Sequence, residues 1–319
     1  MAKRITKHQN CKLQNLGEEL YFKFDGKTIK ALAGDSITSA LVASGKTIIS
    51  RSFKYHRPRG TYDVFGQGHE SLVTVNDEPN LLADRVLVRN GMIVKSQNAW
   101  PSLEFDIGEI NNLIVPLLPN GFYYKMFHKP KWLWPIAEHQ IRKVAGFGKI
   151  DVSGKHMNRR YEKHYRFPDL CIVGGGPAGL ATAKSALEEG KQILLIDENP
   201  KLGGHALHSI VTVENCENDA LNGLLEKEAA QKLIDEISTH PNLEIMVNTS
   251  VFGIYEDNLL AAQCDADLFK IRAESIVLAP GAIDRHLVFE NNDIPGILTA
   301  RGVEKLILNH LSTQIFFKS

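Results

Sequence analysis

The fold of this chain is decided by one stretch, DLCIVGGGPAGLATAKSALEEGKQILLIDENPKLGG, at residues 169–204. DLCIV predicts a short buried strand, and a glycine-rich turn follows it. PAGLATAKSALEEG predicts a helix with an apolar face, and KQILLIDE predicts a second strand. A strand, a helix and a second strand in this order predict a parallel α/β unit.

Three glycines in this stretch, Gly174, Gly176 and Gly179, have the spacing G-x-G-x-x-G. The first permits a tight turn, the second leaves room for a pyrophosphate, and the third lets the helix lie against the strand. The helix N-terminus offers unpaired N–H groups to phosphates. Asp197, 18 residues beyond the third glycine, is placed to accept a hydrogen bond from a ribose hydroxyl. This pattern predicts a Rossmann-like site for NAD or FAD, and the acid disfavours NADP.

Further residues extend this predicted site. Glu198 is a second candidate for contact with ribose or adenine, and a Gly-Gly pair suits backbone that runs close to a cofactor. The small residues Ala178, Ala181 and Ala183 predict close packing of the helix on the sheet. The predicted cofactor-binding residues are Gly174, Gly176, Pro177, Ala178, Gly179, Asp197, Glu198, Gly203, Gly204, Ala279 and Gly281.

The segment Ala279–Gly281 enters this set by resemblance. An apolar strand that ends in Ala-x-Gly resembles the segment of two-dinucleotide-domain flavoproteins that crosses back near the cofactor. Pro280 stands where those proteins usually have threonine, and proline has no N–H to donate.

Length and composition indicate a globular protein of about two domains. The 319 residues are 43% hydrophobic, and 37 Lys and Arg balance 37 Asp and Glu, so the net charge indicates no polyanionic partner. No apolar run reaches the ~20 residues that span a bilayer. The basic N-terminus lacks the apolar core of a secretory signal. We therefore expect a cytoplasmic protein that binds neither membrane nor nucleic acid.

Cysteine and histidine patterns predict neither a metal site nor a catalytic side chain. Cys11, Cys171, Cys216 and Cys264 are far apart and form no CxxC pair, which argues against zinc and against a disulfide framework. Cys171 lies in a strand pattern and is expected to be buried and inert. The twelve histidines form no HxxxH or triad-like group.

Residues 1–99 predict a small β-grasp domain. Asp25-Gly26 and Asn90-Gly91 each lie between apolar runs and predict two hairpins. GDSITSALVASG predicts a short helix with Asp35 or Ser36 at its N-cap, ended by Gly45.

Residues 100–168 predict an irregular connector before an incomplete Rossmann-like domain at 169–319. The connector carries all three tryptophans, and from Gly121 to Arg166 it has eleven Lys and Arg against three Asp and Glu. A surface connector and a partner-subunit interface are both compatible with this composition. Tyr123, Tyr124 and Trp132 could stack on nucleic-acid bases, but no nucleic-acid-binding motif accompanies them.

Several stretches together resemble the alpha subunit of heterotetrameric sarcosine oxidase. They are SRSFKYHRPRGTY, SQNAWPSLEFDIGEINNLIVPLLPNGFYYKMF, VGGGPAGLATA and LAPGAIDRHLVFENNDIPGILTA, and the resemblance runs from about residue 18 to 305. It implies a ferredoxin-like domain, a dinucleotide-binding flavoprotein domain and, in the family, a folate-binding domain. It also implies NAD at the glycine loop, an FMN between alpha and beta subunits, an FAD in the beta subunit, and smaller subunits. The family activity is oxidative demethylation of sarcosine to glycine.

Three expectations follow from this resemblance. Related N-terminal domains bind a [2Fe–2S] cluster through four thiolates, but TYDVFGQGHESLV contains no cysteine, so no cluster is expected. The alternatives to sarcosine oxidase are an alpha-like subunit of an opine, proline or hydroxyproline dehydrogenase, and an inactive assembly subunit. Because family subunits are longer, we expect a truncated or split subunit, with apolar surface at Ile307, Leu308, Ile315, Phe316 and Phe317.

The segment RSFKYHRPRG concentrates positive charge, with Arg51, Lys54, Arg57 and Arg59 around His56. Two interpretations are open. The cations pair with acids inside the domain, or they contact cofactor phosphates or a partner.

Overall fold

A computed structural model describes residues 18–52, 55–67, 71–110, 112, 129–145, 161–216 and 218–310. The chain forms two compact units. One comprises Met1–Val152 with Asp284–Ser319, and the other is Ser153–Ile283. The units therefore divide the chain at other places than the expected limits of 99 and 168. The sequence features that lie outside the described residues are Cys11, Lys54, Tyr123, Tyr124, Ile315, Phe316 and Phe317.

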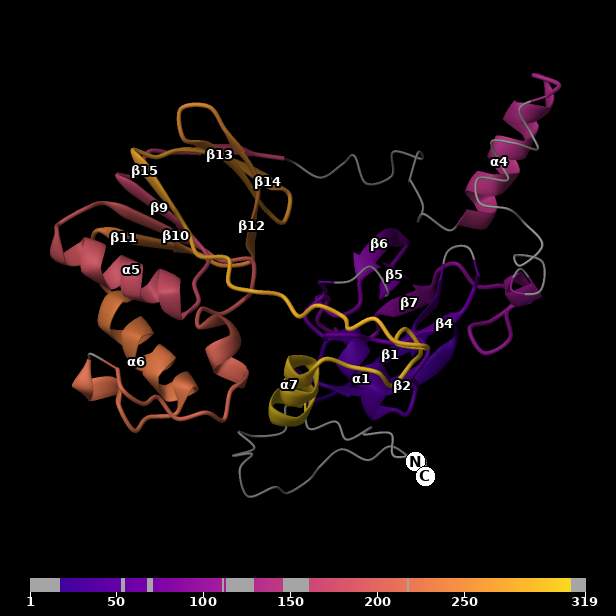
Figure 1. The fold of residues 1–319 in the computed structure, drawn as a ribbon, viewed down its shortest axis with the longest axis horizontal. Coiled ribbons are helices and arrows are strands. Elements are labelled where there is room, and N and C mark those ends of the chain that lie inside the picture. Colours follow the sequence, from indigo (N-terminus) through magenta and orange to yellow (C-terminus); the bar gives the residue numbers. More distant parts are fainter. Residues whose placement is uncertain are drawn as a thin grey trace. The chain divides into compact units, whose positions relative to one another are not determined.

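The first unit is built on a mixed five-stranded sheet (Figure 1). The strand order is β2–β1–β7–β5–β6, in which β1 and β7 are parallel and the other neighbours antiparallel. Asp25 and Gly26 form the expected hairpin turn with φ of 46° and 78°. The strands are β1 (Glu19–Phe24), β2 (Lys27–Leu32), β5 (Leu72–Val75), β6 (Glu78–Leu82) and β7 (Ile93–Ser96).

Helix α1 (Ile37–Ala43) packs against this sheet and closes its core. The hydroxyl of Ser36 caps the helix by accepting the N–H of Ser39 at 3.1 Å, and Gly45 follows the helix with φ of 84°. Phe22, Phe24, Leu41 and Val94 are among the buried core residues. This architecture confirms the expected β-grasp unit.

The hairpin expected around Asn90-Gly91 is wrong. Residues 85–91 contain no strand, and β7 pairs with β1 and β5 instead. The Asn90 side chain accepts the N–H of Tyr21 at 3.1 Å, and the Gly91 N–H donates to the Tyr21 carbonyl at 2.8 Å. The turn residues therefore bond to β1 and not to the segment that precedes them.

The first unit has further short elements. Among its described residues they are β3 (Ser50–Arg51), β4 (Pro58–Arg59), the 3-10 helix η1 (Ile107–Ile110), α4 (Leu133–Ala145) and α7 (Ala300–His310).

In the basic segment, Arg51 and His56 are buried and paired. Arg51 lies 3.2 Å from the carboxylate of Glu109, and its guanidinium also donates to the carbonyl of Leu103. His56 Nδ1 lies 2.6 Å from Asp106 Oδ2, and both side chains are buried. Since a buried charge is costly without a partner, these pairs favour the interpretation of a structural loop.

Arg57 and Arg59 share one carboxylate, Asp293, although they lie more than 230 residues from it. Arg57 contacts Asp293 Oδ1 at 2.8 Å, and Arg59 forms an ion pair with Oδ2. Arg59 also donates to the Asp293 carbonyl at 2.8 Å. Partial burial opposes ionisation of this acid, but Arg59 and Arg57 hold the pKa of Asp293 below its usual value. The basic segment is thus tied to the chain after residue 284.

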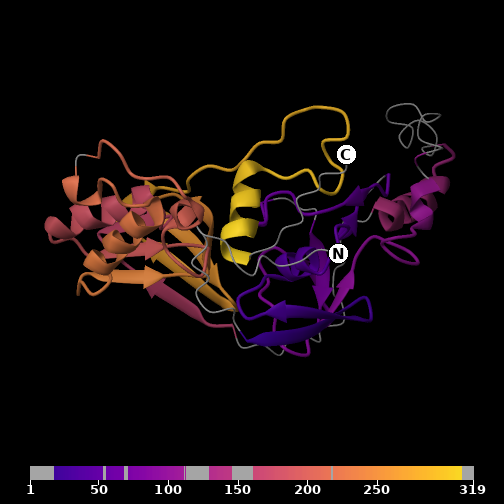
Figure 2. The same ribbon diagram turned by 90° about the horizontal axis from the view of Figure 1, so that it is seen from below.

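The segment 284–310 forms part of the first unit through further contacts. The Tyr62 ring stacks on His286, with ring centroids 3.3 Å apart. Helix α7 is the yellow helix in Figure 2. Its residue Lys305 donates to the carbonyl of Val64 at 2.8 Å and lies 4.1 Å from the ring centroid of Phe65. The apolar side chains at positions 307 and 308 of α7 are half-buried.

The second unit has three layers (Figure 1). Its central sheet is fully parallel, in the order β11–β10–β9–β15. Helices α5 (Pro177–Glu188) and α6 (Glu226–Ile237) pack on one face, and a second sheet, β12–β13–β14–β8, packs on the other. The remaining elements are β8 (Lys163–Arg166), β9 (Leu170–Val173), β10 (Ile193–Ile196), η3 (Gly204–His208), η4 (Asp219–Leu221), β11 (Leu243–Met246), β12 (Thr249–Tyr255), β13 (Leu259–Cys264), β14 (Asp267–Arg272) and β15 (Ser275–Leu278).

The predicted strand, helix and strand of the deciding stretch are confirmed as β9, α5 and β10. All four residues of β10 are buried, with alternate side chains in the two cores. A strand covered on both faces needs the continuous apolar run seen in the sequence.

Lys305 predicts a rise in stability with pH. Burial, opposed by Asp84 and Asp63, lowers the pKa of Lys305 from 10.5 to about 8. Between these values the unfolded chain holds a proton that the folded chain has lost, so the free energy of unfolding rises with pH, by up to about 3 kcal/mol. We expect urea unfolding from pH 8 to 10.5 to show this rise relative to Lys305→Met, in which other groups titrate alike. A constant difference between the two proteins would contradict it.

Asp293→Ala is expected to destabilise the first unit by about 1–3 kcal/mol, because it leaves two arginines without their shared acid. Asp257→Asn is the control, since its carboxylate is 85% exposed and lies 3.5 Å from Arg272, and asparagine tolerates the positive φ of 55° at this position. The control should cost less than about 0.5 kcal/mol. Denaturant midpoints measure both changes, and equal losses would show that the Asp293 pairs are only surface contacts.

Candidate functional site

The glycine loop between β9 and α5 depends on close backbone approach. Gly174 has φ of 108°, and a Cβ placed there would lie 2.1 Å from the carbonyl oxygen of Ala279. A Cβ on Gly179 would lie 1.8 Å from the carbonyl oxygen of Gly174. No side chain fits at either position. The predicted roles of these two glycines in turn formation and helix packing are thus visible as backbone contacts.

Gly176 is different, because space is open beside it. The nearest atom to a Cβ built on Gly176 is the Gly204 Cα at 4.0 Å. Gly176 is the N-cap of α5, no side chain caps the helix there, and Pro177 follows at its first turn. The first N–H groups of a helix have no partner within the helix, and the helix dipole favours negative charge there. We call this open position at the N-terminus of α5 the cradle, and helix N-termini of this kind commonly bind phosphate groups in proteins.

Asp197 is positioned by β10 and lies under the loop. Its Oδ2 accepts the N–H of Gly175 at 2.6 Å, and its Oδ1 accepts the backbone N–H of Asn199 at 2.7 Å. The side chain is buried, with 6% of the residue exposed. Glu198, the next residue, is exposed. Sequence reasoning missed Gly175, because the x of G-x-G carries no residue preference that would mark it.

The pair Gly203-Gly204 returns the chain to the loop. Gly203 has φ of 114°, and its N–H donates to the carbonyl of Gly175 at 2.7 Å. A Cβ on Gly204 would lie 3.0 Å from the Gly176 Cα. The structure therefore brings both glycines beside the loop.

The crossing segment also lies at this site. The Ala279 N–H donates to the Val173 carbonyl at 2.8 Å, which continues the β9–β15 pairing up to the loop. His205 Nε2 lies 3.2 Å from the carbonyl oxygen of Ala282 and links the crossing segment to η3. Gly281 is exposed with φ of 73° and has open space around it.

Helix α5 corrects one expectation about packing. Of the three small residues predicted to face the sheet, only Ala183 is buried, whereas Ala178 and Ala181 are exposed. The buried face also includes Leu180 and Ala186. The i, i+3 spacing of a helix explains this face, because residue 181 points away from the row of residues 180, 183 and 186.

Cys171 is fully buried in β9, as expected. Burial disfavours its thiolate and raises its pKa to about 12. A thiol that stays protonated at neutral pH is a poor nucleophile, which agrees with an inert structural role.

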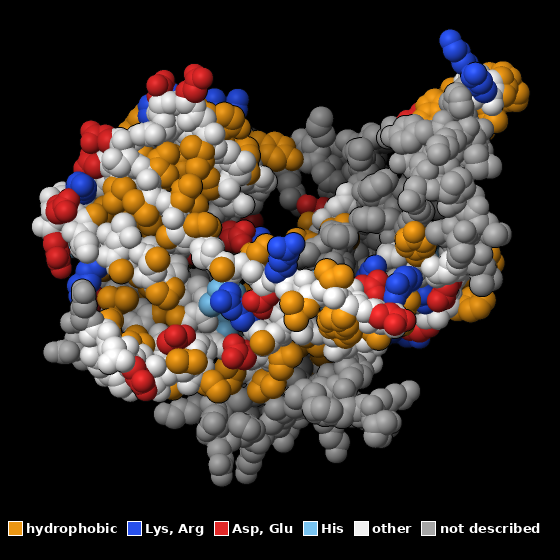
Figure 3. Space-filling view, viewed as in Figure 1, with side chains coloured by type: hydrophobic (Ala, Val, Ile, Leu, Met, Phe, Trp, Pro, Cys, Tyr) orange, Lys and Arg blue, Asp and Glu red, His pale blue; other side chains and the backbone are white. Residues whose placement is uncertain are grey.

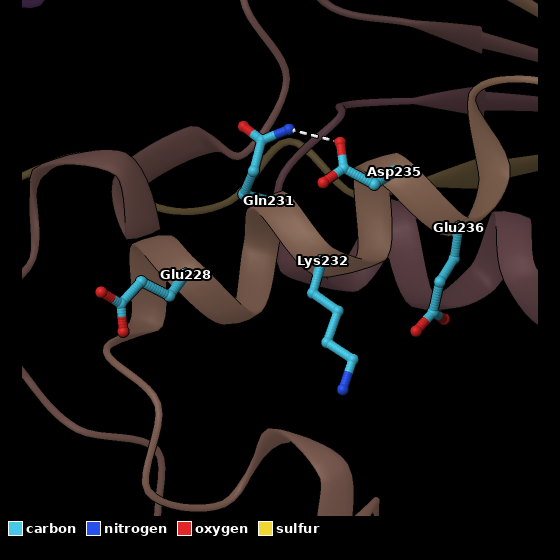
Figure 4. Close-up of a pocket in the computed structure, with 5 residues that line it drawn as sticks. All are labelled: Glu228, Gln231, Lys232, Asp235 and Glu236. Carbon is cyan, nitrogen blue, oxygen red and sulfur yellow. Dashed lines mark hydrogen bonds between the residues drawn. The ribbon is translucent and has the colours of Figure 1, made fainter.

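A polar hollow of about 480 Å³ lies along the solvent side of α6 (Figure 4). Gln231 donates to Asp235 at 2.8 Å, and Glu236 accepts from Lys184 at 2.6 Å. Glu228 accepts the N–H of Leu225 at 3.2 Å, and Lys232 donates to the carbonyl of Ala220 at 3.2 Å. None of the lining residues belongs to the predicted site. In Figure 3, Lys and Arg side chains are interspersed with Asp and Glu over the described part of the visible face. The hollow is therefore ordinary charged surface.

Two families match the chain. The 2Fe-2S iron-sulfur cluster binding domain matches residues 17–99, and the pyridine nucleotide-disulphide oxidoreductase family matches residues 168–316. The sarcosine oxidase subunit alpha of Rhizobium meliloti (strain 1021) is 38% identical over 309 residues, which is 91% of this chain and 30% of the relative. The chain is thus similar over most of its length to part of a sarcosine oxidase alpha subunit. The same subunit of Corynebacterium sp. (strain U-96) is 27% identical over 308 residues, 92% of this chain and 27% of the relative.

This chain thus spans less than a third of the length of either of these curated relatives. Among solved structures, L-proline dehydrogenase from P. horikoshii superposes with a TM-score of 0.64 at 22% identity, and the match covers 92% of this chain and 47% of that chain. This structural match shows a shared fold. Together with the two matching families it confirms a ferredoxin-like unit followed by a dinucleotide-binding fold.

The residues matched to the iron–sulfur family do not fit its cluster. Biological [2Fe–2S] clusters are held by thiolates, with histidine in one subclass. Residues 17–99 contain no cysteine. Within the described part of the chain, no group of three or more His, Cys, Asp or Glu side chains could hold a metal ion. The helices that the structure describes also include none long and apolar enough to cross a membrane.

The loop contacts predict that Gly179 and Gly176 differ sharply in how well they tolerate replacement by alanine. Gly179→Ala should lower the free energy of unfolding by at least about 3 kcal/mol, because its methyl group meets backbone that cannot move aside. Gly176→Ala is the matched control and should cost no more than about 1 kcal/mol, since its methyl group enters open space. Chemical denaturation of both variants measures the difference, and similar losses would contradict the loop geometry.

Proposed function

We propose that this chain is the dinucleotide-binding part of a sarcosine oxidase alpha-like subunit. The enzyme is a flavin-dependent oxidoreductase that acts on the CH–NH group of an amine and demethylates sarcosine to glycine. The observation that carries the proposal is the open cradle at Gly176, on a loop in which backbone atoms fill the space beside Gly174 and Gly179. The 38% identity to a sarcosine oxidase alpha subunit supports the reaction class.

The ligand of the cradle is an adenine dinucleotide, NAD or FAD. Gly176, Pro177 and Ala178 at the start of α5 would hold its pyrophosphate, as helix N-termini do. The carboxylates of Asp197 and Glu198 at the end of β10 supply negative charge near the ribose, which disfavours a 2′-phosphate. When bound, the dinucleotide supplies a carrier of two electrons.

The remaining predicted contacts shape the edge of the site. Gly203 and Gly204 have no side chains that would enter the space beside the loop. The carbonyl of Ala279 packs against Gly174. Gly281 allows the crossing segment to turn away with positive φ. These residues exclude side-chain atoms and leave the chemistry to the cofactors.

The amine chemistry belongs to partner subunits in this proposal. The named relatives are alpha subunits, so each assembles with other chains. A beta-like subunit would carry FAD and the amine-oxidising site, with FMN between it and this chain, in a cytoplasmic complex with smaller subunits. No side chain of this chain is assigned a catalytic role, and neither nucleic acid nor membrane is a partner.

The first unit is proposed to contain no iron–sulfur cluster, because its matched range lacks thiolate ligands. It would serve as a structural domain, in which the arginines of the basic segment pair with acidic side chains of the same unit. Iron analysis of the purified chain should find no iron above that in a matched buffer, and a stoichiometric cluster spectrum would overturn this part of the proposal.

Gly176→Val is expected to abolish nucleotide retention while leaving the fold intact, because the side chain fills the space that the pyrophosphate needs. The wild-type chain should release NAD or FAD on denaturation, identified by chromatography. The control is Ser185→Val, which places the same side chain at an exposed position of the same helix, α5. Retention of nucleotide by a folded Gly176→Val protein would contradict the site.

The substrate is tested with the complex purified together with its partner subunits. We expect sarcosine-dependent release of hydrogen peroxide, with no oxidation of proline, hydroxyproline or an opine. The structural match to L-proline dehydrogenase makes proline the specific alternative. Turnover of proline in place of sarcosine would assign the chain to a dehydrogenase of that kind.

A further inference from the structure

We propose that Asp197 acts on the nucleotide site by positioning the peptide of Gly175, and that it does not act by binding the ribose. The proposal rests on the proposed function and deepens it, since it changes how the acid at the end of β10 contributes to binding. It assigns Asp197 as a positioning residue for the glycine loop.

Both carboxylate oxygens of Asp197 already accept hydrogen bonds from protein donors. Oδ2 takes the N–H of Gly175 at 2.6 Å. Oδ1 takes the backbone N–H of Asn199 at 2.7 Å and its side-chain amide at 3.0 Å. With 6% of the residue exposed, little of this carboxylate can reach a ligand.

The carbonyl of Gly175, which belongs to the next peptide group, is held by residues that follow Asp197 in the chain. The Gly203 N–H donates to the Gly175 carbonyl at 2.7 Å. A Cβ on Gly175 would lie 2.3 Å from a methyl group of Leu202, so this residue covers Gly175 closely. Asp197, Leu202 and Gly203 thus form a clamp on Gly175, and we use that name for these three residues.

The clamp matters because the loop consists of three consecutive glycines. Glycine has the largest backbone freedom, so an unheld loop would lose that freedom when a phosphate binds. A loop that is held in the binding shape before the ligand arrives binds more tightly, since the ordering cost is already met in folding.

The carboxylate is needed for this role because of its two acceptors. An ionised acceptor shortens and strengthens a hydrogen bond from a backbone N–H, and the bond from Gly175 to Asp197 is short, at 2.6 Å. Asparagine has one acceptor oxygen and one NH₂ group. Asparagine at position 197 therefore cannot accept from both Gly175 and Asn199, and one of these hydrogen bonds is lost in Asp197→Asn.

The first experiment compares ADP with 2′-deoxy-ADP by calorimetry on the full chain. An acid that binds the ribose recognises the 2′-hydroxyl. We expect Asp197→Asn to weaken both nucleotides by the same factor, about tenfold or more, because the lost bond involves a charged group. Loss of ADP affinity only to the level of 2′-deoxy-ADP would overturn the proposal, and so would unchanged affinity for both.

Asp169→Asn is the matched control. Asp169 precedes β9, and its carboxylate accepts the N–H of Gln192 at 2.8 Å, which is the same kind of contact at the opposite end of the strand. This variant should lose less stability than Asp197→Asn, because its hydrogen bond is exposed, and it should keep both affinities. A parallel loss of nucleotide affinity in Asp169→Asn would show that the effect is general destabilisation.

A second measurement needs no nucleotide. In the chain labelled with ¹⁵N-glycine, the short bond to Asp197 should place the Gly175 amide proton far downfield. The signal should move upfield in Asp197→Asn and stay in place in Asp169→Asn. An unmoved Gly175 signal would overturn the clamp. If wild-type chain binds neither nucleotide, the proposed function fails, while this signal still tests the clamp.

Discussion

The central constraint in the second unit is that peptide backbones must meet without side chains between them. The Gly174 carbonyl lies where a Cβ of Gly179 would be, and the Ala279 carbonyl lies where a Cβ of Gly174 would be. The first contact seats α5 on β9, and the second seats β15 beside β9. Helix packing, sheet pairing and the shape of the loop therefore depend on the same two glycines. The open space at Gly176 exists because its neighbours are filled in this way.

The first unit depends on a different constraint, which is the cost of burying charge. Arg51 and His56 lie in the interior, so each has an acid within hydrogen-bond distance. Arg57 and Arg59 obtain theirs from Asp293, in a segment that follows the whole dinucleotide-binding unit in the chain. The positive charge that the sequence concentrates around residue 56 is consequently used in internal pairing. This pairing is also the reason why residues after 284 belong to the first unit.

These two constraints differ in how far they can be read from the residues. The G-x-G-x-x-G spacing, the continuous apolar run of β10 and the Asp25-Gly26 turn are local patterns, and each predicted the element that forms. Asn90-Gly91 is an equally good local turn signal, yet it forms no hairpin. Instead β7 pairs with β1, and the Asn90 side chain bonds to Tyr21 of β1. Likewise Ala178 and Ala181 look suited to packing on the sheet, but the face of α5 is set by the row that begins at Leu180. Local signals therefore identified elements reliably and their partners less so.

The sequence by itself determined the order of elements in the second unit, the glycines of the loop, the absence of cysteine from residues 17–99 and the family that the chain resembles. These follow from spacing, apolar periodicity and residue type, which act within a few residues of chain. Tertiary structure decided that Asp197 lies beneath Gly175, that Gly176 faces open space, and that Asp293 serves Arg57 and Arg59. Each of these is a contact between residues that are far apart along the chain. Such contacts depend on which surfaces meet when the sheets and helices pack, and no local pattern contains that information.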